Sequence, residues 1–361
     1  MKIIKGFLVS KIYDVNLDYL RGILAIYIVV YHLLSWNHFI ELNGNTIFIK
    51  LAFYFVSLFF IISGYALTIS AINHKYNFRN RWDVFYYFQR RFARIYPLFI
   101  LVIVLAILIG YRNISSIKEF LYQITLTFNI FNRDGLTPAS WSIGVEVIFY
   151  LFFPLIFIIF DNLFKLNKPL FNIMLFLIIF LLLLSSYYNY YEKFSEKHYF
   201  FIYVHNFYNH LYFFLIGMYF AFNRQYLFNL KNKKFFKFFL FFLLILFLIW
   251  NSHYTNLYWN YLYGINRIIL SSSSLGIFLL FLLFFNFKGF IKNILKFLGD
   301  ISYTVYLMHP LFLYLYASII HRISNLLHLL LSIFFVITGS AIIYFYYEDP
   351  FRKLINSLKV R

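Results

Sequence analysis

Two ionisable side chains inside the first apolar run of the sequence are the first candidates for chemistry. Arg21 and His32 both lie within residues 17–36. An ionisable side chain is costly inside a membrane span and usually faces the interior of a helix bundle. Their separation corresponds to about 16 Å and about three turns of helix, so they share one face at different depths. His32 is suited to carry a proton near neutral pH; a buried, hydrogen-bonded structural histidine is the alternative interpretation.

The acid deepest in an apolar run is Glu146, which follows Trp141 and Ser142 at the start of the run 142–160. Ser142 is a candidate cap for this helix, and Trp141 is a candidate anchor at the membrane interface. Neither role explains a carboxylate one turn further into the membrane. We expect Glu146 near the membrane face opposite to the cytoplasmic one. Asp18, one turn before Arg21, is expected to pair with that arginine.

Arg90, Arg91 and Arg94 form a basic cluster where a loop enters the apolar run 90–110. Arginine binds phosphate through two parallel hydrogen bonds, so three guanidiniums so close together suit a polyanionic phosphate ligand. The alternative interpretation is an ordinary group of positive charges on the cytoplasmic side of a membrane protein.

The remaining candidates within apolar runs carry a hydroxyl or an imidazole: Ser63, Tyr65, Tyr303, Tyr306 and His309. Glu348, followed by Asp349 and Pro350, marks the cytoplasmic end of the run 325–346, where a helix stop is the alternative interpretation. The residues Tyr303, Tyr306 and His309 recur every three positions and form one stripe of a helix. Packing explains the tyrosines more readily than the histidine. Gly64, between Ser63 and Tyr65, permits the close approach of a second helix.

The composition shows what kind of chain positions these residues. Of 361 residues, 63% are hydrophobic and 12% are charged, against about 45–50% and about 25% in soluble proteins. These values exclude a soluble domain and a disordered chain, and the alternation of a membrane β-barrel is absent. We predict an all-α, polytopic membrane bundle of about ten helices in one domain, residues 1–361, with a core from about 12 to 355. The predicted spans are 17–36, 47–70, 90–110, 142–160, 169–187, 207–223, 235–250, 266–286, 301–320 and 325–346.

The charges set the expected topology and exclude several partners. The net charge is +19, and most of the charged residues lie between the apolar runs. This distribution favours contacts with anionic membrane lipids over nucleic acid. An even number of spans puts both termini on one side, and that side carries 23 Lys and Arg residues against six on the other. Both termini of a multi-pass protein of the cell membrane are therefore predicted to be cytoplasmic. The absence of cysteine excludes disulfides, thiolate metal sites and a cysteine acyl-enzyme, and no metal site is predicted.

The order and spacing of these motifs resemble the membrane acyltransferase 3 family. The similar elements are Arg21-x10-His32, Ser63-Gly64-Tyr65, Arg90-Arg91-x2-Arg94, Trp141-Ser142-x3-Glu146-x2-Phe149-Tyr150, Ser302-Tyr303-x2-Tyr306-x2-His309-Pro310 and Glu348-Asp349-Pro350. The resemblance covers nearly the whole chain. This sequence shows no counterpart of the soluble SGNH-type domain that is fused to some members.

The resemblance implies an enzyme that moves an acyl group, usually acetyl, from cytoplasmic acyl-CoA to a hydroxyl of a glycan or glycolipid, such as lipopolysaccharide, capsule or exopolysaccharide. It implies that the arginine cluster holds the CoA phosphates and that His32, with Arg21, acts where thioester and hydroxyl meet. His32 would be a general base or become acylated itself. Glu146 would act on the acceptor side or through the packing of its helix. Acyl-CoA would be a substrate, with no permanently bound cofactor. A multi-span transporter or exporter of a glycan or lipid intermediate is the alternative function, although the sequence shows no paired halves.

Thiol labelling tests the predicted orientation in this cysteine-free chain. In a Ser115→Cys variant, a membrane-impermeant reagent added outside intact cells should label the new thiol, because the segment 111–141 carries few positive charges and is predicted to be external. In the matched Ser357→Cys variant, labelling should require permeabilised cells. The reverse pattern in active variants would contradict the topology.

Overall fold

All regular structure in the described residues is helical. The computed structural model describes residues 13–36, 47–131, 133–191, 205–230, 233–253, 264–320 and 326–358. Within these ranges, eight helices are long and apolar enough to cross a membrane. A helix satisfies its own backbone hydrogen bonds, which lipid cannot do. The prediction of an all-α, polytopic membrane bundle is confirmed.

The helices keep the order of the predicted apolar runs, and each run overlaps a helix. They are α1 (Val15–Trp36), α2 (Ile47–Asn73), α3 (Arg81–Leu108), α4 (Ile117–Ile124), α5 (Ser140–Leu166), α6 (Lys168–Tyr191), α8 (Leu211–Phe222), α9 (Arg224–Leu230), α10 (Lys234–His253), α11 (Gly264–Phe284), α12 (Gly289–Ile320), α13 (Leu326–Ile343) and α14 (Asp349–Ser357). A short 3-10 turn, Phe207–Asn209, precedes α8, and a π-helical turn, Tyr344–Glu348, joins α13 to α14. The helices α8 and α10 are not among the eight candidate spans.

The helix α3 begins earlier than the sequence predicts. The side chain of Asn80 accepts a hydrogen bond from the backbone N–H of Trp82 at 3.0 Å and so caps the helix. The polar first turns of α3 are therefore helical although they are not apolar. As a result, the cluster Arg90–Arg94 lies inside the helix and not in a loop at its entry.

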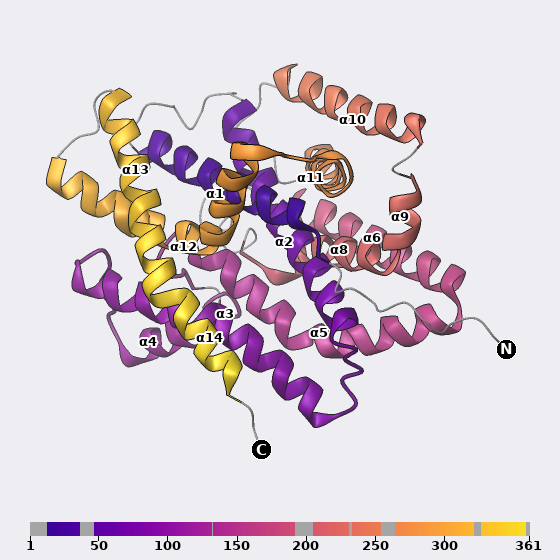
Figure 1. Ribbon diagram of the computed structural model, residues 1–361, viewed down its shortest axis with the longest axis horizontal. Helices are drawn as coiled ribbons and strands as arrows, with labels where there is room; N and C mark the ends of the chain where they lie inside the picture. The colour runs from indigo at the N-terminus through magenta and orange to yellow at the C-terminus, as the bar shows by residue number, and fades with distance from the viewer. Residues whose placement is uncertain are drawn as a thin grey trace.

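The helices α1 and α12 form one of the two most extensive helix interfaces in the described structure (Figure 1). A Cβ on Gly22 would lie 2.7 Å from the backbone nitrogen of Gly299, and a Cβ on Gly299 would lie 2.5 Å from the carbonyl oxygen of Asp18. Only glycine permits so close an approach. His32 and His309 each stand ten residues beyond these glycines, a rise of about 15 Å along both helices. Parallel helices that cross at the glycines therefore bring the histidines to the same level.

The helices α2 and α8 cross as closely. A Cβ on Gly64 would lie 2.1 Å from the carbonyl oxygen of Phe214, and one on Gly217 would lie 2.1 Å from the carbonyl oxygen of Ile61. These reciprocal contacts confirm the prediction that Gly64 permits close helix approach. Because Ser63 precedes Gly64, the crossing also fixes where its hydroxyl lies.

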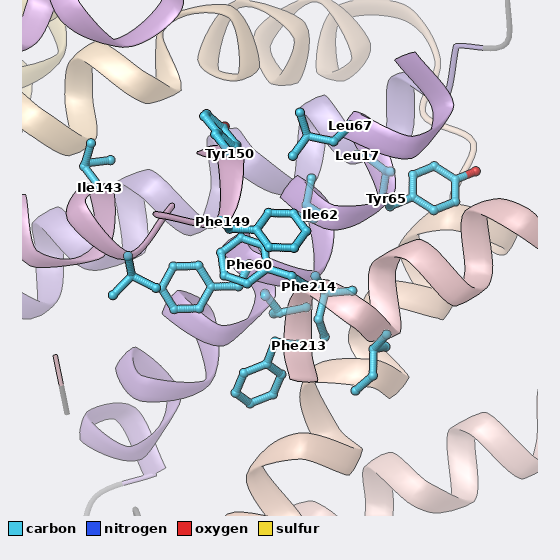
Figure 2. Close-up of a cluster of buried hydrophobic side chains, with 14 of the residues drawn as sticks. Leu17, Phe60, Ile62, Tyr65, Leu67, Ile143, Phe149, Tyr150, Phe213 and Phe214 are labelled. Carbon is cyan, nitrogen blue, oxygen red and sulfur yellow. The ribbon is translucent and has the colours of Figure 1, made fainter. Parts of the chain in front are cut away.

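An aromatic cluster ties α5 to this pair of helices (Figure 2). The rings of Phe149 and Phe214 stack with centroids 4.2 Å apart, and Phe60 lies 4.9 Å from Phe214. All three side chains are buried. Aromatic pairs of this kind stabilise a fold by about 0.5–1.5 kcal/mol each beyond their area burial. The cluster holds α5 at a fixed depth against α2 and α8.

The first turn of α5 is recessed because the segment before it folds over it. The side chains of Leu126, Phe128 and Leu136 on this segment are all buried. Asn129 donates a hydrogen bond from Nδ2 to the carbonyl of Trp141 at 2.6 Å. The start of α5 therefore lies inside the protein and not at its surface.

The C-terminal helix α14 packs along α3 (Figure 1). Gln89 of α3 donates hydrogen bonds from Nε2 to the carbonyls of Ile355 and Leu358, each at 2.7 Å. The last carbonyls of a helix have no partner within it, so a side chain that binds them stabilises the helix end. This contact fixes the arginine-bearing turns of α3 against the C-terminal helix.

The glycine crossing predicts a stability effect with a matched control. Gly299→Ala should lower the free energy of unfolding by about 1–3 kcal/mol, because the new methyl group overlaps the Asp18 carbonyl. A Cβ on Gly276 of α11 would meet nothing within 4 Å, so Gly276→Ala should leave stability unchanged or raise it. Thermal unfolding of the detergent-purified proteins measures both. Equal melting temperatures for the two variants would contradict the proposed crossing.

Candidate active site

A cavity lies where α1, α2, α3, α5 and α12 meet. Its volume is about 50 Å³, which is about four water-sized spheres. Half of the candidate residues from the sequence line it: Arg21, Ser63, Arg94, Ser142, Glu146, Tyr303 and Tyr306. The structure therefore brings motifs from five separate helices to one place.

Glu146 lines the cavity and accepts hydrogen bonds from two neighbouring hydroxyl groups. Its Oε1 accepts hydrogen bonds from the hydroxyls of Ser63 and Tyr150. The carboxylate also interacts electrostatically with Arg21 and Arg94. The sequence predicts Glu146 near the membrane face opposite to the cytoplasmic one, whereas the structure places it beside Arg21 and Arg94. The recessed start of α5 brings its carboxylate into the same cavity as both arginines.

Arg21 and Arg94 place two guanidiniums at this cavity, where Glu146 and Asp18 balance their charge. Arg21 makes the predicted ion pair with Asp18, with Nη1 and Oδ1 2.8 Å apart. Among the described residues that line the cavity, Glu146 is the only acid facing the two guanidiniums. Fixed positive groups around a small, poorly solvated space favour a bound anion or an oxygen that gains negative charge during a reaction.

The three arginines of the cluster Arg90–Arg94 on α3 have different surroundings. Arg94 lines the cavity. The guanidinium of Arg91 lies 5.6 Å from the centre of the Tyr150 ring, and its buried Nε has no hydrogen-bond partner among the described residues. Arg90 lies over the ring of Tyr76, 5.7 Å from its centre, in the loop before α3. Arg91 and Arg94 thus adjoin the Glu146–Tyr150 pair, and Arg90 lies beside the loop.

Tyr306 and Ser142 connect α12 to α5 on the cavity wall. Their hydroxyl oxygens lie 2.7 Å apart. The interpretation of Ser142 as a helix cap is wrong, because α5 begins at Ser140 after Ala139, which makes no side-chain cap. Ser142 lies inside the helix, where its hydroxyl faces the tyrosine. Tyr303, one turn before Tyr306, reaches a backbone carbonyl of α3 at 3.4 Å.

Beyond Tyr306, two histidines meet edge to edge, and a tryptophan stacks on one of them. His32 Nδ1 and His309 Nε2 lie 2.8 Å apart, with ring centres 5.0 Å apart and an interplanar angle of 13°. The indole of Trp36 stacks on His32 at 4.6 Å. His309 is fully buried, whereas Trp36 is 41% exposed. The ring of Tyr306, 6.2 Å from that of His309, links this histidine pair to the cavity.

Tyr65 does not reach the cavity. It stands two residues from Ser63, which turns it to a different face of α2. Its hydroxyl donates to Asp14 Oδ2 at 2.7 Å and accepts from Nε of Arg224 at 3.1 Å. This network joins α2 to the start of α9 and to the residue before α1.

Trp141 and Glu348 also lie outside the cavity lining. Trp141 stacks on His205, with ring centres 4.9 Å apart. Glu348, in the π-helical turn, accepts a hydrogen bond from the hydroxyl of Thr304 on α12. It acts on the cavity through its electrostatic attraction for Arg94.

Two further residues, Tyr150 and Trp36, contact the candidate site residues, and the sequence motifs did not single them out for a role. Tyr150 follows Glu146 by four positions, and Trp36 follows His32 by four positions. Residues four apart share one face of a helix. This spacing was the available signal for both contacts.

The known proteins similar to this chain include O-acetyltransferases. A family model described as an acyltransferase domain matches residues 14–345. The O-acetyltransferase OatA of Staphylococcus aureus is 29% identical over 163 residues, which cover 41% of this chain and 25% of that protein. A putative O-acetyltransferase of the same species is 28% identical over 172 residues, or 43% of this chain and 26% of the relative.

An uncharacterized protein of Haemophilus influenzae is 30% identical over 139 residues, which cover 34% of this chain and 56% of that protein. The aligned part of the chain spans about a quarter of the length of the two staphylococcal proteins. No solved structure matches the chain.

A double-mutant cycle tests the electrostatic coupling in the cavity. Glu146→Gln and Arg94→Gln should be non-additive in unfolding free energy by about 0.5–3 kcal/mol, because the two charges face one another. Arg90→Gln is the matched control, since Arg90 lies over Tyr76. It should add to Glu146→Gln within about 0.3–0.5 kcal/mol. Equal coupling for both arginines would remove Arg94 from the Glu146 network.

Proposed function

The chain belongs to the acyltransferase 3 family, whose domain model covers residues 14–345, and on this premise we propose that it transfers an acyl group from cytoplasmic acyl-CoA to a hydroxyl of a surface glycan or glycolipid. One observation carries the proposal: His32 lies about 16 Å along α1 from Arg21, and the cavity that Arg21 lines also holds Arg94 and Glu146. Acetyl is the proposed acyl group. The small cavity and the similarity to O-acetyltransferases support this choice.

The arginines provide the donor side of the proposed reaction. Arg91 and Arg94 bind the CoA phosphates from the cytoplasmic end of α3, and the pantetheine arm extends toward His32. Guanidiniums suit phosphate because they form paired, charge-assisted hydrogen bonds. Arg21 adds positive charge at the same level. The buried Nε of Arg91, which has no partner among the described residues, supports a role in binding an external acceptor group.

His32 performs the proton transfer in this proposal. The glycan hydroxyl oxygen attacks the thioester carbonyl carbon, and its proton moves to the imidazole. The carbon–sulfur bond then breaks, and the CoA thiolate takes the proton from the imidazolium. A positioned base of this kind typically supplies about 10²–10⁴-fold in rate. A route through an acylated His32 uses the same ring as the nucleophile.

The charge bias supports the proposed orientation. The end of the bundle that bears Arg90 and Arg91 is cytoplasmic in the predicted topology, with both termini on that side. The His32 end then faces the compartment that holds the acceptor. Donor and acceptor thus meet inside the bundle from opposite sides of the cell membrane.

Separate measurements of binding and turnover test these assignments. Arg94→Ala should weaken acyl-CoA binding by roughly 10- to 100-fold, the effect of losing about 1.5–3 kcal/mol in a charge-assisted contact. His32→Ala should bind acyl-CoA like the parent but transfer no acyl group. Lys118→Ala, on the exposed helix α4 at the other end, is the matched control for loss of a positive charge.

The cellular readout is the mass of surface glycans from cells that carry the parent gene, the His32→Ala variant or no gene. The proposal predicts that an acyl mass disappears in the last two. Unchanged glycan masses in all three would contradict the proposed acceptor, and normal transfer by His32→Ala would remove this residue from the mechanism.

A further inference from the structure

Pro310 leaves one carbonyl of α12 without its usual helical partner. In a helix the N–H of residue i donates to the carbonyl of residue i−4, and proline has no N–H. The carbonyl of Tyr306 therefore receives no backbone hydrogen bond from position 310. Instead, His309 Nδ1 lies 2.8 Å from this oxygen and 3.3 Å from the carbonyl oxygen of Val305.

This contact fixes the protons of both histidines. A carbonyl oxygen only accepts, so the hydrogen of the neutral His309 ring stands on Nδ1, and its Nε2 carries a lone pair. His32 Nδ1, 2.8 Å from that Nε2, must then be the donor. A neutral His32 ring with its hydrogen on Nδ1 has its lone pair on Nε2.

We infer that His309 and Pro310 are positioning residues, which set the tautomer of His32 so that its Nε2 is the nitrogen that receives the acceptor's proton. This inference rests on the proposed function and adds a chain of three groups to it: the Tyr306 carbonyl, His309 and His32. No proton leaves His309 during turnover. Its ring holds His32 by one hydrogen bond while the proton is taken up and returned at the far nitrogen.

The surroundings of the pair support a fixed orientation. His309 is fully buried in α12, so its ring has little freedom to turn away from the carbonyl. The indole ring of Trp36 lies nearly parallel to both imidazoles, with its centre 4.6 Å from that of His32 and 6.3 Å from that of His309. An aromatic face next to an imidazole also stabilises the positive charge that forms when the ring is protonated.

Three variants separate this role from simple packing. His309→Leu removes the acceptor for His32 Nδ1, and kcat should fall about 100-fold or more, the usual contribution of a positioned base. His309→Gln keeps an oxygen that can accept this hydrogen bond, and kcat should stay within about tenfold of the parent. The KM for acyl-CoA should be unchanged in both, because the arginine cavity is intact.

Pro310→Ala provides the readout that a packing role would not change. It restores an N–H that competes with His309 for the Tyr306 carbonyl, and kcat should fall about fivefold, the population change that one net hydrogen bond of about 1 kcal/mol produces. A helical alanine in place of proline should also raise the melting temperature. A structural role alone predicts a variant that is more stable and at least as active.

The assay follows CoA release and glycan acylation by the full-length protein in proteoliposomes, with acetyl-CoA as donor. A parent that transfers, with slow His309→Leu, near-normal His309→Gln and a stable but slower Pro310→Ala, supports the inference. Equal kcat for the Leu and Gln variants, or parental kcat for Pro310→Ala, overturns it while the proposed function stands. A parent that releases no CoA and acylates no glycan overturns the proposed function and this inference with it.

Discussion

Gly22 and Gly299 let the backbones of α1 and α12 touch, because neither residue has a Cβ and each would otherwise collide with the opposite helix. The rest of the site depends on this contact. Two helices that cross at one fixed point and run parallel must keep the same register further along. The pair of histidines ten residues beyond the glycines, His32 and His309, is the consequence. A membrane bundle is suited to such a contact, since association of its helices depends on close packing and not on hydrophobic burial. The position of the two histidines therefore depends on two glycines, Gly22 and Gly299, which have no Cβ.

The second constraint is the cost of charge inside a membrane protein. Arg21, Arg94 and Glu146 occupy one small cavity, where unpaired charges are expensive. The bundle compensates with hydroxyl donors to the carboxylate, from Ser63 and Tyr150, and with an ion pair between Arg21 and Asp18. The two guanidiniums are thus balanced by the carboxylates of Glu146 and Asp18. In the proposed reaction Arg94, together with Arg91, receives the anionic donor.

The sequence predicts the helices, because apolar runs depend on local information, and half of the candidate residues that it offers line the cavity. The sequence does not predict how deep in the bundle each side chain lies. Glu146 belongs to the arginine cavity because the segment with buried Phe128 covers the start of α5, and no periodicity within α5 contains that information. The contact between His32 and His309 depends on the glycine crossing, and Gly299 has no distinguishing sequence context. Tyr65 does not line the cavity with Ser63 for a simpler reason. Two positions along a helix turn a side chain to a different face.

In the proposed mechanism, one helix bundle connects a cytoplasmic donor to an acceptor on the other side of the membrane through His32. The most direct measurement encloses labelled acetyl-CoA in proteoliposomes and places purified surface glycan outside. We expect label to reach the external glycan with the parent protein and not with His32→Ala, although both retain acetyl-CoA binding. Label on the glycan at the parental rate with His32→Ala, or transfer only when donor and acceptor share one side, would contradict it.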